Sequence, residues 1–225
     1  YIPDPFSDHS KCNPKSIEPI QEFQLNLTRG SSRNVKKSFS KELSFKFFIS
    51  FFKSGIKIKT YILLLKQLIH EKIDKKKLNR RRVFQSIINF DIYCKLLKLK
   101  SPRFSTFFTN HVASSMHRYW EAAYPKDFKG KNKQNSNWIK IYKNEIDFAM
   151  HAFESQLYSL IKFVEKNKSF EIWICTSMGQ APVINYSPVE YQLYLTQPQK
   201  LINFLKLNPK SFEIKPAMMP RWTLK

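Results

Sequence analysis

The chain has 225 residues, with 39 Lys and Arg against 17 Asp and Glu, so its formal net charge is +22. An aromatic content of 15% excludes a disordered basic tail, and the length is sufficient to bury a core. The three cysteines lie far apart without a CxxC pair. This spacing excludes a disulfide scaffold and a zinc finger, and predicts reduced thiols in a cytoplasmic protein. The longest uncharged apolar runs, 47–52 and 61–65, are too short to cross a bilayer, so we expect no transmembrane segment.

The positive charge is concentrated in residues 36–100, where 18 Lys and Arg face 4 Asp and Glu, a net charge of +14. Two clusters, 75–77 and 80–82, are purely basic. A solvated helical face explains them, and so does contact with phosphate on nucleic acid, anionic lipid or a phosphorylated substrate. The chain has no RNP-like aromatic strand, GXXG loop or Cys/His finger, so nucleic acid is the less favoured partner.

The first half of the chain has helical patterns after a proline-rich, extended lead-in over residues 1–18. We expect a short helix at 20–27 and longer helices at 38–53, 60–77 and 80–97, which make 36–100 a basic helical subregion. In the second of the longer helices, apolar residues recur every three or four positions and predict one core-facing side. These residues are Ile62, Leu65, Leu68, Ile69 and Ile73. A basic hairpin with a binding role is the alternative reading of the region.

The second half predicts a βαβ unit. Residues 104–109 are rich in β-formers, residues 141–166 have a long helical period, and Phe170–Cys175 is almost continuously apolar, as a buried parallel strand would be. A short helix is expected near 200–207. The expected fold is therefore α/β, with a mostly parallel sheet and a right-handed βαβ unit at 104–177 inside a core that extends to 182. We expect a single domain over 1–225, incomplete at the N-terminus because the chain begins at Tyr1.

Ligands of open α/β sheets bind beyond the carboxyl ends of the strands, so the segments that follow the two predicted strands, 110–120 and 176–180, are the candidate site. His111 and His117 are candidate metal ligands, or else hydrogen-bonded loop residues. Arg118 is a candidate anion clamp, or else a surface ion-pair partner. The candidate substrate-binding residues are Asn110, Ser114, Arg118, Ser177 and Gln180.

Two sequence motifs resemble those of a known family. They are Phe-Phe-Thr-Asn-His-Val-Ala-Ser-Ser-Met-His-Arg-Tyr-Trp, residues 107–120, and Thr-Ser-Met-Gly, residues 176–179. In this order, around a long helix, they resemble the type I phosphodiesterase/nucleotide pyrophosphatase branch of the alkaline phosphatase superfamily. The resemblance covers about residues 104–182. It implies an alkaline phosphatase-like domain and a phosphate- or sulfate-ester substrate.

The resemblance also implies a metal site, which this sequence matches only in part. Active members hold two divalent metals, usually zinc, beside a Thr or Ser nucleophile. Their first motif supplies an Asp and, four residues on, a His; these positions fall on Ala113 and His117. Their Asp-His pair falls on Ser177 and Met178, before Gly179. A methyl group, a hydroxyl and a thioether replace three of the four ligands, so the standard two-metal site is not expected.

The sequence therefore predicts a divergent hydrolase or transferase that acts on a phosphate or sulfate ester, with one divalent metal, zinc or manganese, or none. Two alternatives stay open. One is a pseudoenzyme that keeps the fold in order to bind a ligand or partner. The other is a protein that binds a polyanion, either nucleic acid or an anionic surface, through residues 36–100.

Overall fold

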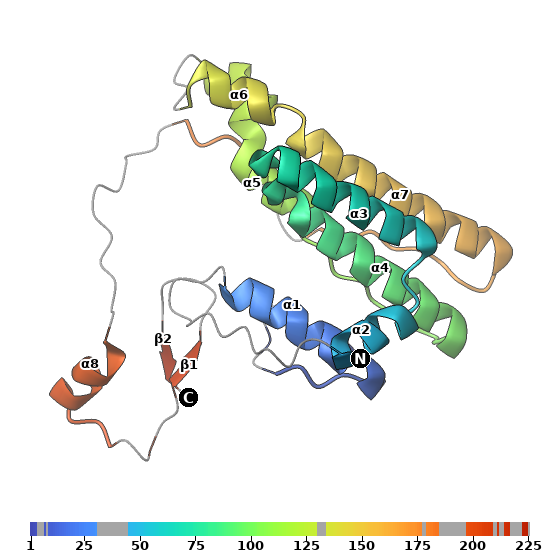
Figure 1. Cartoon of the computed structure of the whole chain (residues 1–225), viewed down its shortest axis with the longest axis horizontal. Helices are drawn as coiled ribbons and strands as arrows, with labels where there is room; N and C mark the ends of the chain where they lie inside the picture. Colours follow the sequence, from blue (N-terminus) through green and yellow to red (C-terminus); the bar gives the residue numbers. More distant parts are fainter. Residues whose placement is uncertain are drawn as a thin grey trace. The chain divides into compact units, whose positions relative to one another are not determined.

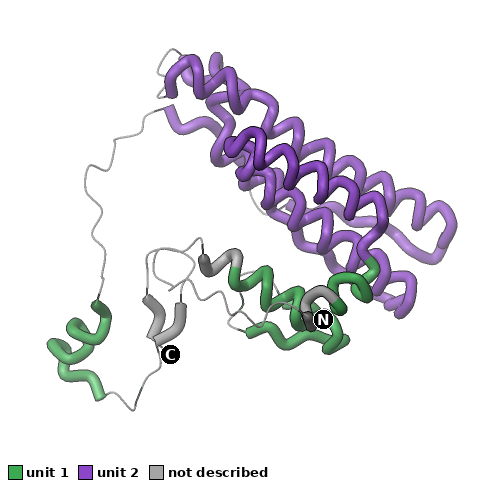
Figure 2. The backbone as a smooth tube through the Cα atoms, in the orientation of Figure 1, with its two compact units in different colours: residues 1–55, 188–225 green, residues 56–187 purple. Residues whose placement is uncertain are grey.

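A computed structural model of the chain shows a largely helical protein (Figure 1). Two compact parts are distinguished in Figure 2: unit 1, residues 1–55 and 188–225, and unit 2, residues 56–187. The structure describes the following residues: 1–3, 7, 9–30, 45–129, 134–176, 179–184, 197–208, 211, 214–216 and 222–224.

Unit 2 is a bundle of helices, and its elements follow in chain order. They are α3 (Ile58–Ile73), η3 (Lys75–Arg80), α4 (Arg81–Lys100), α5 (His111–Ala123), η4 (Pro125–Phe128), α6 (Ser136–Tyr142) and α7 (Glu145–Lys166). Helix α5 packs against α6 and α7, and α4 packs against α5 and α7. The bundle buries Phe84, Ile92, Ile146 and Ala149, all of which occur at helical spacing in the sequence. The helices predicted at 60–77, 80–97 and 141–166 are confirmed, although α6 and α7 divide the last of them.

Unit 1 contains η1 (Lys15–Ile17), α1 (Glu18–Gly30), α2 (Phe45–Lys53), α8 (Pro198–Phe204) and the strands β1 (Ile214–Pro216) and β2 (Trp222–Leu224). Helix α1 contacts α2 and η1, and it buries Ile20 and Leu25. The two strands pair in an antiparallel register, with Lys215 opposite Thr223. The helices predicted at 20–27 and near 200–207 are confirmed. The helix predicted at 38–53 is confirmed over 45–53, and the remainder of that range lies outside the described residues.

The predicted α/β fold with a mostly parallel sheet is wrong. The only paired strands among the described residues are β1 and β2, which are antiparallel and lie outside the predicted βαβ unit. Residues 104–109 and 170–175 have no strand pairing with any other described residue. Strand propensity measures how well a side chain fits a pleated, half-buried surface, so it does not produce a strand without a neighbouring strand.

These two segments pack against the helices through side-chain contacts instead of pairing in a sheet. The Phe107 ring lies 5.4 Å from that of Phe90, and the Tyr93 hydroxyl is 2.9 Å from Ser105 Oγ. The Phe170 ring lies 5.4 Å from that of Phe163 on α7. The outer side chains of both segments stay in solvent, and Cys175, expected to be buried, is exposed.

Helix α3 also differs from its prediction. The residues expected to face the core, Ile62, Leu65, Leu68, Ile69 and Ile73, are all exposed. The buried side chains of α3 are polar: Thr60, Gln67 and Glu71. The helical period was correct, but the face that packs against the bundle is the polar one. None of the helices in the described ranges combines the length and the apolar character needed to cross a membrane.

Candidate functional site

The segment that carries the most specific motif, 110–120, is helical. Asn110 is the N-cap residue of α5, and its exposed side chain makes no capping hydrogen bond. His111 and Ser115, one turn apart, are buried, whereas His117 and Arg118 are exposed. The helix therefore has a polar buried side and a basic outer side, and the candidate residues divide between them.

His111 lies in a buried chain of hydrogen bonds that joins α4, α5 and α7. Its Nε2 is 3.2 Å from the Ala149 carbonyl oxygen, and its Nδ1 is 2.6 Å from Thr109 Oγ1. Thr109 Oγ1 is in turn 2.9 Å from Ser86 Oγ, and the Gln156 amide donates to Ser86 Oγ at 3.0 Å. The chain ties the first turn of α5 to both of its neighbouring helices.

The chemistry of the partners fixes the direction of each of these bonds. A carbonyl oxygen can only accept, so His111 Nε2 carries the proton and, in the neutral ring, Nδ1 accepts from the Thr109 hydroxyl. The Thr109 oxygen then accepts from Ser86, which accepts from Gln156. Burial lowers the pKa of His111 below its ordinary value of 6.5, although the hydrogen bond to Ala149 opposes this shift. His111 is therefore neutral at pH 7.

This geometry leaves neither ring nitrogen of His111 free to bind a metal. His117 lies six residues further along α5, which rotates its side chain about 120° away from His111 around the helix axis. No group of three or more His, Cys, Asp and Glu side chains in the described ranges is placed to hold a metal ion. His111 here supports the packing of the helices.

The two motif segments nevertheless meet. The Gln180 side-chain amide donates to the Ala113 carbonyl oxygen on α5 at 3.2 Å, across 67 residues. Ser114, next to Ala113, is half-buried. Ser177, the other candidate in the second segment, lies outside the described residues, as does Met178. The expected proximity of the two segments is thus present at Gln180 without a sheet to create it.

The basic cluster 80–82 is divided by the structure into paired and unpaired cations. Arg80 makes a bidentate ion pair with the buried carboxylate of Glu145, at 2.7 Å for the shortest contact. Arg81 pairs in the same way with buried Glu71, at 2.6 Å. Bidentate pairs to buried carboxylates are structural, because either partner alone would be an uncompensated charge. Arg80 and Arg81 are therefore engaged in structural ion pairs, although the Arg81 side chain is itself exposed.

Arg82 on α4 lies near a second arginine, Arg118 on α5. The guanidinium of Arg118 lies close enough to act on it: burial, and next the positive charge of Arg118, lower the pKa of Arg82 from its ordinary value, while Tyr119 raises it. Within the described ranges neither Arg82 nor Arg118 forms an ion pair or a hydrogen bond. Helices α4 and α5, which carry them, pack together. Both side chains are exposed. An anion bound between two like charges on adjacent helices would reduce their repulsion.

An aromatic cluster adjoins Arg118 on α5 and continues onto α6. The Tyr119 ring stacks on Tyr142, with centroids 5.2 Å apart and planes 21° apart, and Trp138 lies 5.2 Å from Tyr142. All three rings are half-buried. Sequence reasoning missed this cluster, although the i,i+4 spacing of Trp138 and Tyr142 on a helix was a signal for it.

The end of unit 2 that carries α6 and the start of α7 is also where α3 ends and α4 begins (Figure 1). Two exposed lysines of η3, Lys75 and Lys76, lie at this end. Two acidic residues lie there as well: Asp74, whose carboxylate accepts the Lys76 backbone amide at 3.0 Å, and Glu145, which pairs with Arg80. Burial, and after it the charges of Tyr119, Asp74 and Glu145, raise the pKa of Tyr142. We call Arg82, Arg118 and the three aromatic rings the basic–aromatic site.

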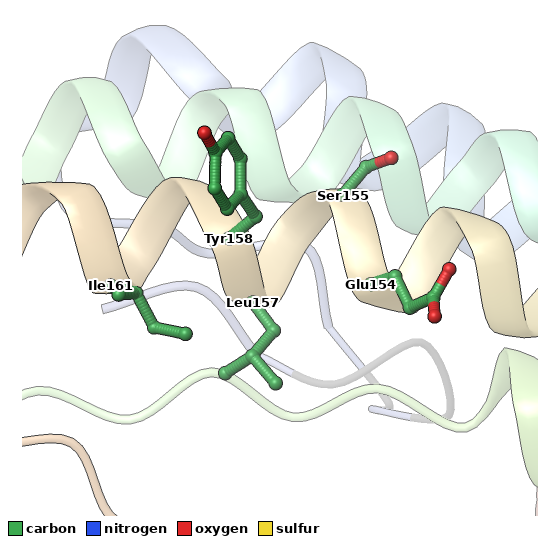
Figure 3. Close-up of a pocket in the computed structure, with 5 residues that line it drawn as sticks. All are labelled: Glu154, Ser155, Leu157, Tyr158 and Ile161. Carbon is green, nitrogen blue, oxygen red and sulfur yellow. The ribbon is translucent and has the colours of Figure 1, made fainter.

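A shallow depression of about 430 Å³ lies elsewhere, along one side of α7 (Figure 3). All five side chains that line it come from that single helix: Glu154, Ser155, Leu157, Tyr158 and Ile161. Its acidic group, Glu154, already accepts from His151 at 3.0 Å, so the depression lacks the convergent polar groups of a binding pocket.

The fold and the site together define a helical protein in which two neighbouring arginines, without ion-pair partners in the described structure, lie next to stacked aromatic rings. No family model, curated protein or solved structure matches the chain.

Proposed function

We propose that unit 2 binds phosphate esters at the basic–aromatic site, with Arg82 and Arg118 as the phosphate contacts. The observation that carries this proposal is that the positive charge of Arg118 acts on Arg82 across two packed helices, while neither side chain has an ion-pair partner in the described structure. A guanidinium offers a planar fork of donors that matches phosphate geometry, and a dianionic phosphate would offset the repulsion between two such groups.

The neighbouring rings favour a ligand that also has a flat, unsaturated part. Aromatic side chains bind nucleobases by stacking, and a positively charged groove beside them follows the phosphates. Tyr119 is next to Arg118 in sequence and stacks on Tyr142, so phosphate and base contacts come from the same turn of α5. The proposed ligand class is therefore a nucleotide or a short single-stranded nucleic acid.

The test is titration of the full chain with adenosine 5′-monophosphate and with a ten-nucleotide single strand, followed by calorimetry. Arg82→Gln and Arg118→Gln should each weaken binding at least about tenfold, since a hydrogen bond to a charged group contributes about 1.5–3 kcal/mol. Binding of the oligonucleotide should also weaken as salt rises, with a shallower dependence in the variants.

Arg103→Gln is the matched control, because it removes the same charge from an exposed residue beyond the far end of α4. It should change either affinity less than twofold. If Arg103→Gln weakens binding as much as Arg82→Gln does, only net charge matters and the site does not exist. If the mononucleotide does not bind but the oligonucleotide does, the ligand is a polymer.

Hydrolysis of a phosphate or sulfate ester is a second candidate function. The Gln180–Ala113 hydrogen bond favours it, because it brings the residue that follows the second motif into contact with the helix that carries the first. The test is turnover of a chromogenic phosphodiester and a chromogenic sulfate ester by the full chain, with and without added zinc or manganese. Turnover that is lost in His117→Ala would support this function, and the absence of turnover under every condition would contradict it.

A further inference from the structure

Helix α3 presents opposite chemistry on its two sides. The side toward the bundle carries Thr60, Gln67 and Glu71, all buried, together with the half-buried Leu63 and Leu64. The opposite side carries exposed aliphatic residues. Most amphipathic helices of water-soluble domains bury the aliphatic side instead. The reversal requires something that holds the polar side inward and something that covers the apolar side.

Polar contacts hold the helix in this orientation along its whole length. At its start, the Thr60 hydroxyl donates to Asp91 Oδ2 at 2.6 Å. In the middle, the Gln67 side chain donates to the Lys77 carbonyl oxygen at 2.7 Å, and near the end Glu71 accepts from Arg81 at 2.6 Å. Rotation of the helix to bury its aliphatic side would break all of these bonds and separate the buried Glu71 carboxylate from Arg81, which is strongly destabilising.

The outward side is a continuous apolar stripe on a helix at the surface of unit 2 (Figure 1). Six large aliphatic side chains on it are between 49% and 80% exposed: Ile58, Ile62, Leu65, Leu68, Ile69 and Ile73. Together they expose on the order of 600 Å² of apolar surface, which is at the upper end for the largest patch on a soluble monomer and is typical of an interaction surface.

Cations border this stripe. Lys59 and Lys66 lie along one edge of it, and Lys72 lies near its C-terminal end, between Leu68 and Ile69 around the helix axis; all three are exposed. The acidic residue of α3, Glu71, is buried against Arg81, so the outward surface of this helix carries positive charge only. The exposed lysines Lys75 and Lys76 extend the positive charge past its end.

We infer that the α3 stripe docks onto an anionic lipid bilayer. A helix that lies in the plane of a bilayer has an apolar face toward the acyl chains and lysines at its edges, which reach the headgroups. Each lysine near an anionic leaflet adds to the attraction. A second copy of the chain fits less well, because pairing two α3 stripes would bring the bordering lysines of both copies together.

The test is cosedimentation of the full chain with vesicles of phosphatidylcholine alone and with vesicles that contain 30% phosphatidylserine. We expect binding to the anionic vesicles, and at least a tenfold weaker partition for the triple variant Ile62→Ser, Leu65→Ser, Ile69→Ser. These side chains are exposed, so the variant should melt at the wild-type temperature. Replacement of Lys59, Lys66 and Lys72 by Gln should remove most of the preference for anionic vesicles.

The matched control is Met150→Ser with Ile161→Ser, which removes exposed apolar side chains from α7 instead and should leave partition unchanged. Arg82→Gln should also leave it unchanged, which separates this inference from the nucleotide site. The inference is overturned if the chain does not bind anionic vesicles, or if the α3 variant binds them as wild type does. Concentration-dependent dimerisation that the α3 variant abolishes, without vesicle binding, would assign the stripe to a second copy.

Discussion

Arg80 and Glu145 form a bidentate ion pair that joins the turn between α3 and α4 to the first residue of α7, across 65 residues of chain. The Glu145 side chain is 5% exposed and that of Arg80 is 18% exposed. The Arg80 guanidinium also lies 4.0 Å from the centre of the Phe148 ring, one turn further along α7. The pair thus fixes where α7 begins and holds it against α4.

The first prediction follows from the burial of Glu145. Arg80→Ala should lower the free energy of unfolding by about 3 kcal/mol, because it leaves a buried carboxylate without its main partner. Arg82→Ala, two residues away, should change it by less than about 0.5 kcal/mol, because Arg82 has no carboxylate partner within the described structure. Urea unfolding followed by circular dichroism measures both. Equal losses in the two variants would show that the Arg80–Glu145 pair contributes nothing specific.

The second prediction concerns Glu71. Burial alone would raise the pKa of this carboxyl group, but hydrogen bonds from Arg81 and Gln67 outweigh burial and lower it below its ordinary value of 4.5. The Glu71–Arg81 pair therefore makes its full contribution to stability above pH 4.5. This contribution is lost as pH falls from 4.5 toward the lowered pKa of the folded state, because the carboxyl group of the unfolded chain is protonated first. The stability difference between wild type and Glu71→Gln should be largest at pH 7 and should shrink at pH 4 and pH 3.

Glu165→Gln is the control for this experiment. Glu165 is an exposed residue near the end of α7, so its replacement should change stability little at any of these pH values. A difference for Glu71→Gln that stays constant from pH 7 to pH 3 would mean that its ionisation is not linked to folding.

The third prediction concerns the neutral His111 ring. Because its pKa is lowered in the folded chain, the unfolded state binds a proton first as pH falls below about 6.5, and stability decreases by up to about 1.4 kcal/mol per pH unit. Wild type should therefore be less stable at pH 5.5 than at pH 7.5. His111→Gln should be less stable than wild type at pH 7.5 but should lose this part of the pH dependence.

His117→Gln separates the two histidines of α5. His117 is exposed, so its replacement should keep the wild-type dependence on pH. If His117→Gln abolishes the dependence and His111→Gln keeps it, the assignment of the buried proton-linked group is wrong.

Much of the helical structure could be predicted from the sequence, because long apolar periods and glycine or proline stops are local signals. The orientation of α3 could not. Its aliphatic residues form the stronger pattern, but Asp91 and Arg81, both on α4, provide charged partners for its polar side. Which face of a helix is buried depends on those distant partners, and one helical period carries no information about them.

The strand predictions failed for a related reason. Residues 104–109 and 170–175 have the composition of strands, and neither segment is helical in the structure. Pairing is nevertheless a property of two segments and not of one. At the candidate site, the proximity of Gln180 to α5 agreed with expectation although the expected sheet was wrong. The division of three consecutive arginines into two structural residues and one unpaired residue could not be predicted, because Glu71 and Glu145 reach them from α3 and α7.

The fourth prediction uses the three thiols as reporters of the fold. Burial, and next the negative charge of Glu18, raise the pKa of Cys12 to about 11, and burial raises that of Cys94. Cys175 is exposed and lies outside the helices. Because the thiolate is the reactive form, a disulfide reagent at pH 8 should modify Cys175 first and Cys12 far more slowly. Cys175→Ser should remove the fast phase of modification, whereas Cys12→Ser should keep this phase. If the fast phase is lost in Cys12→Ser and kept in Cys175→Ser, residues 170–175 lie in the interior, as the apolar composition of that segment suggests.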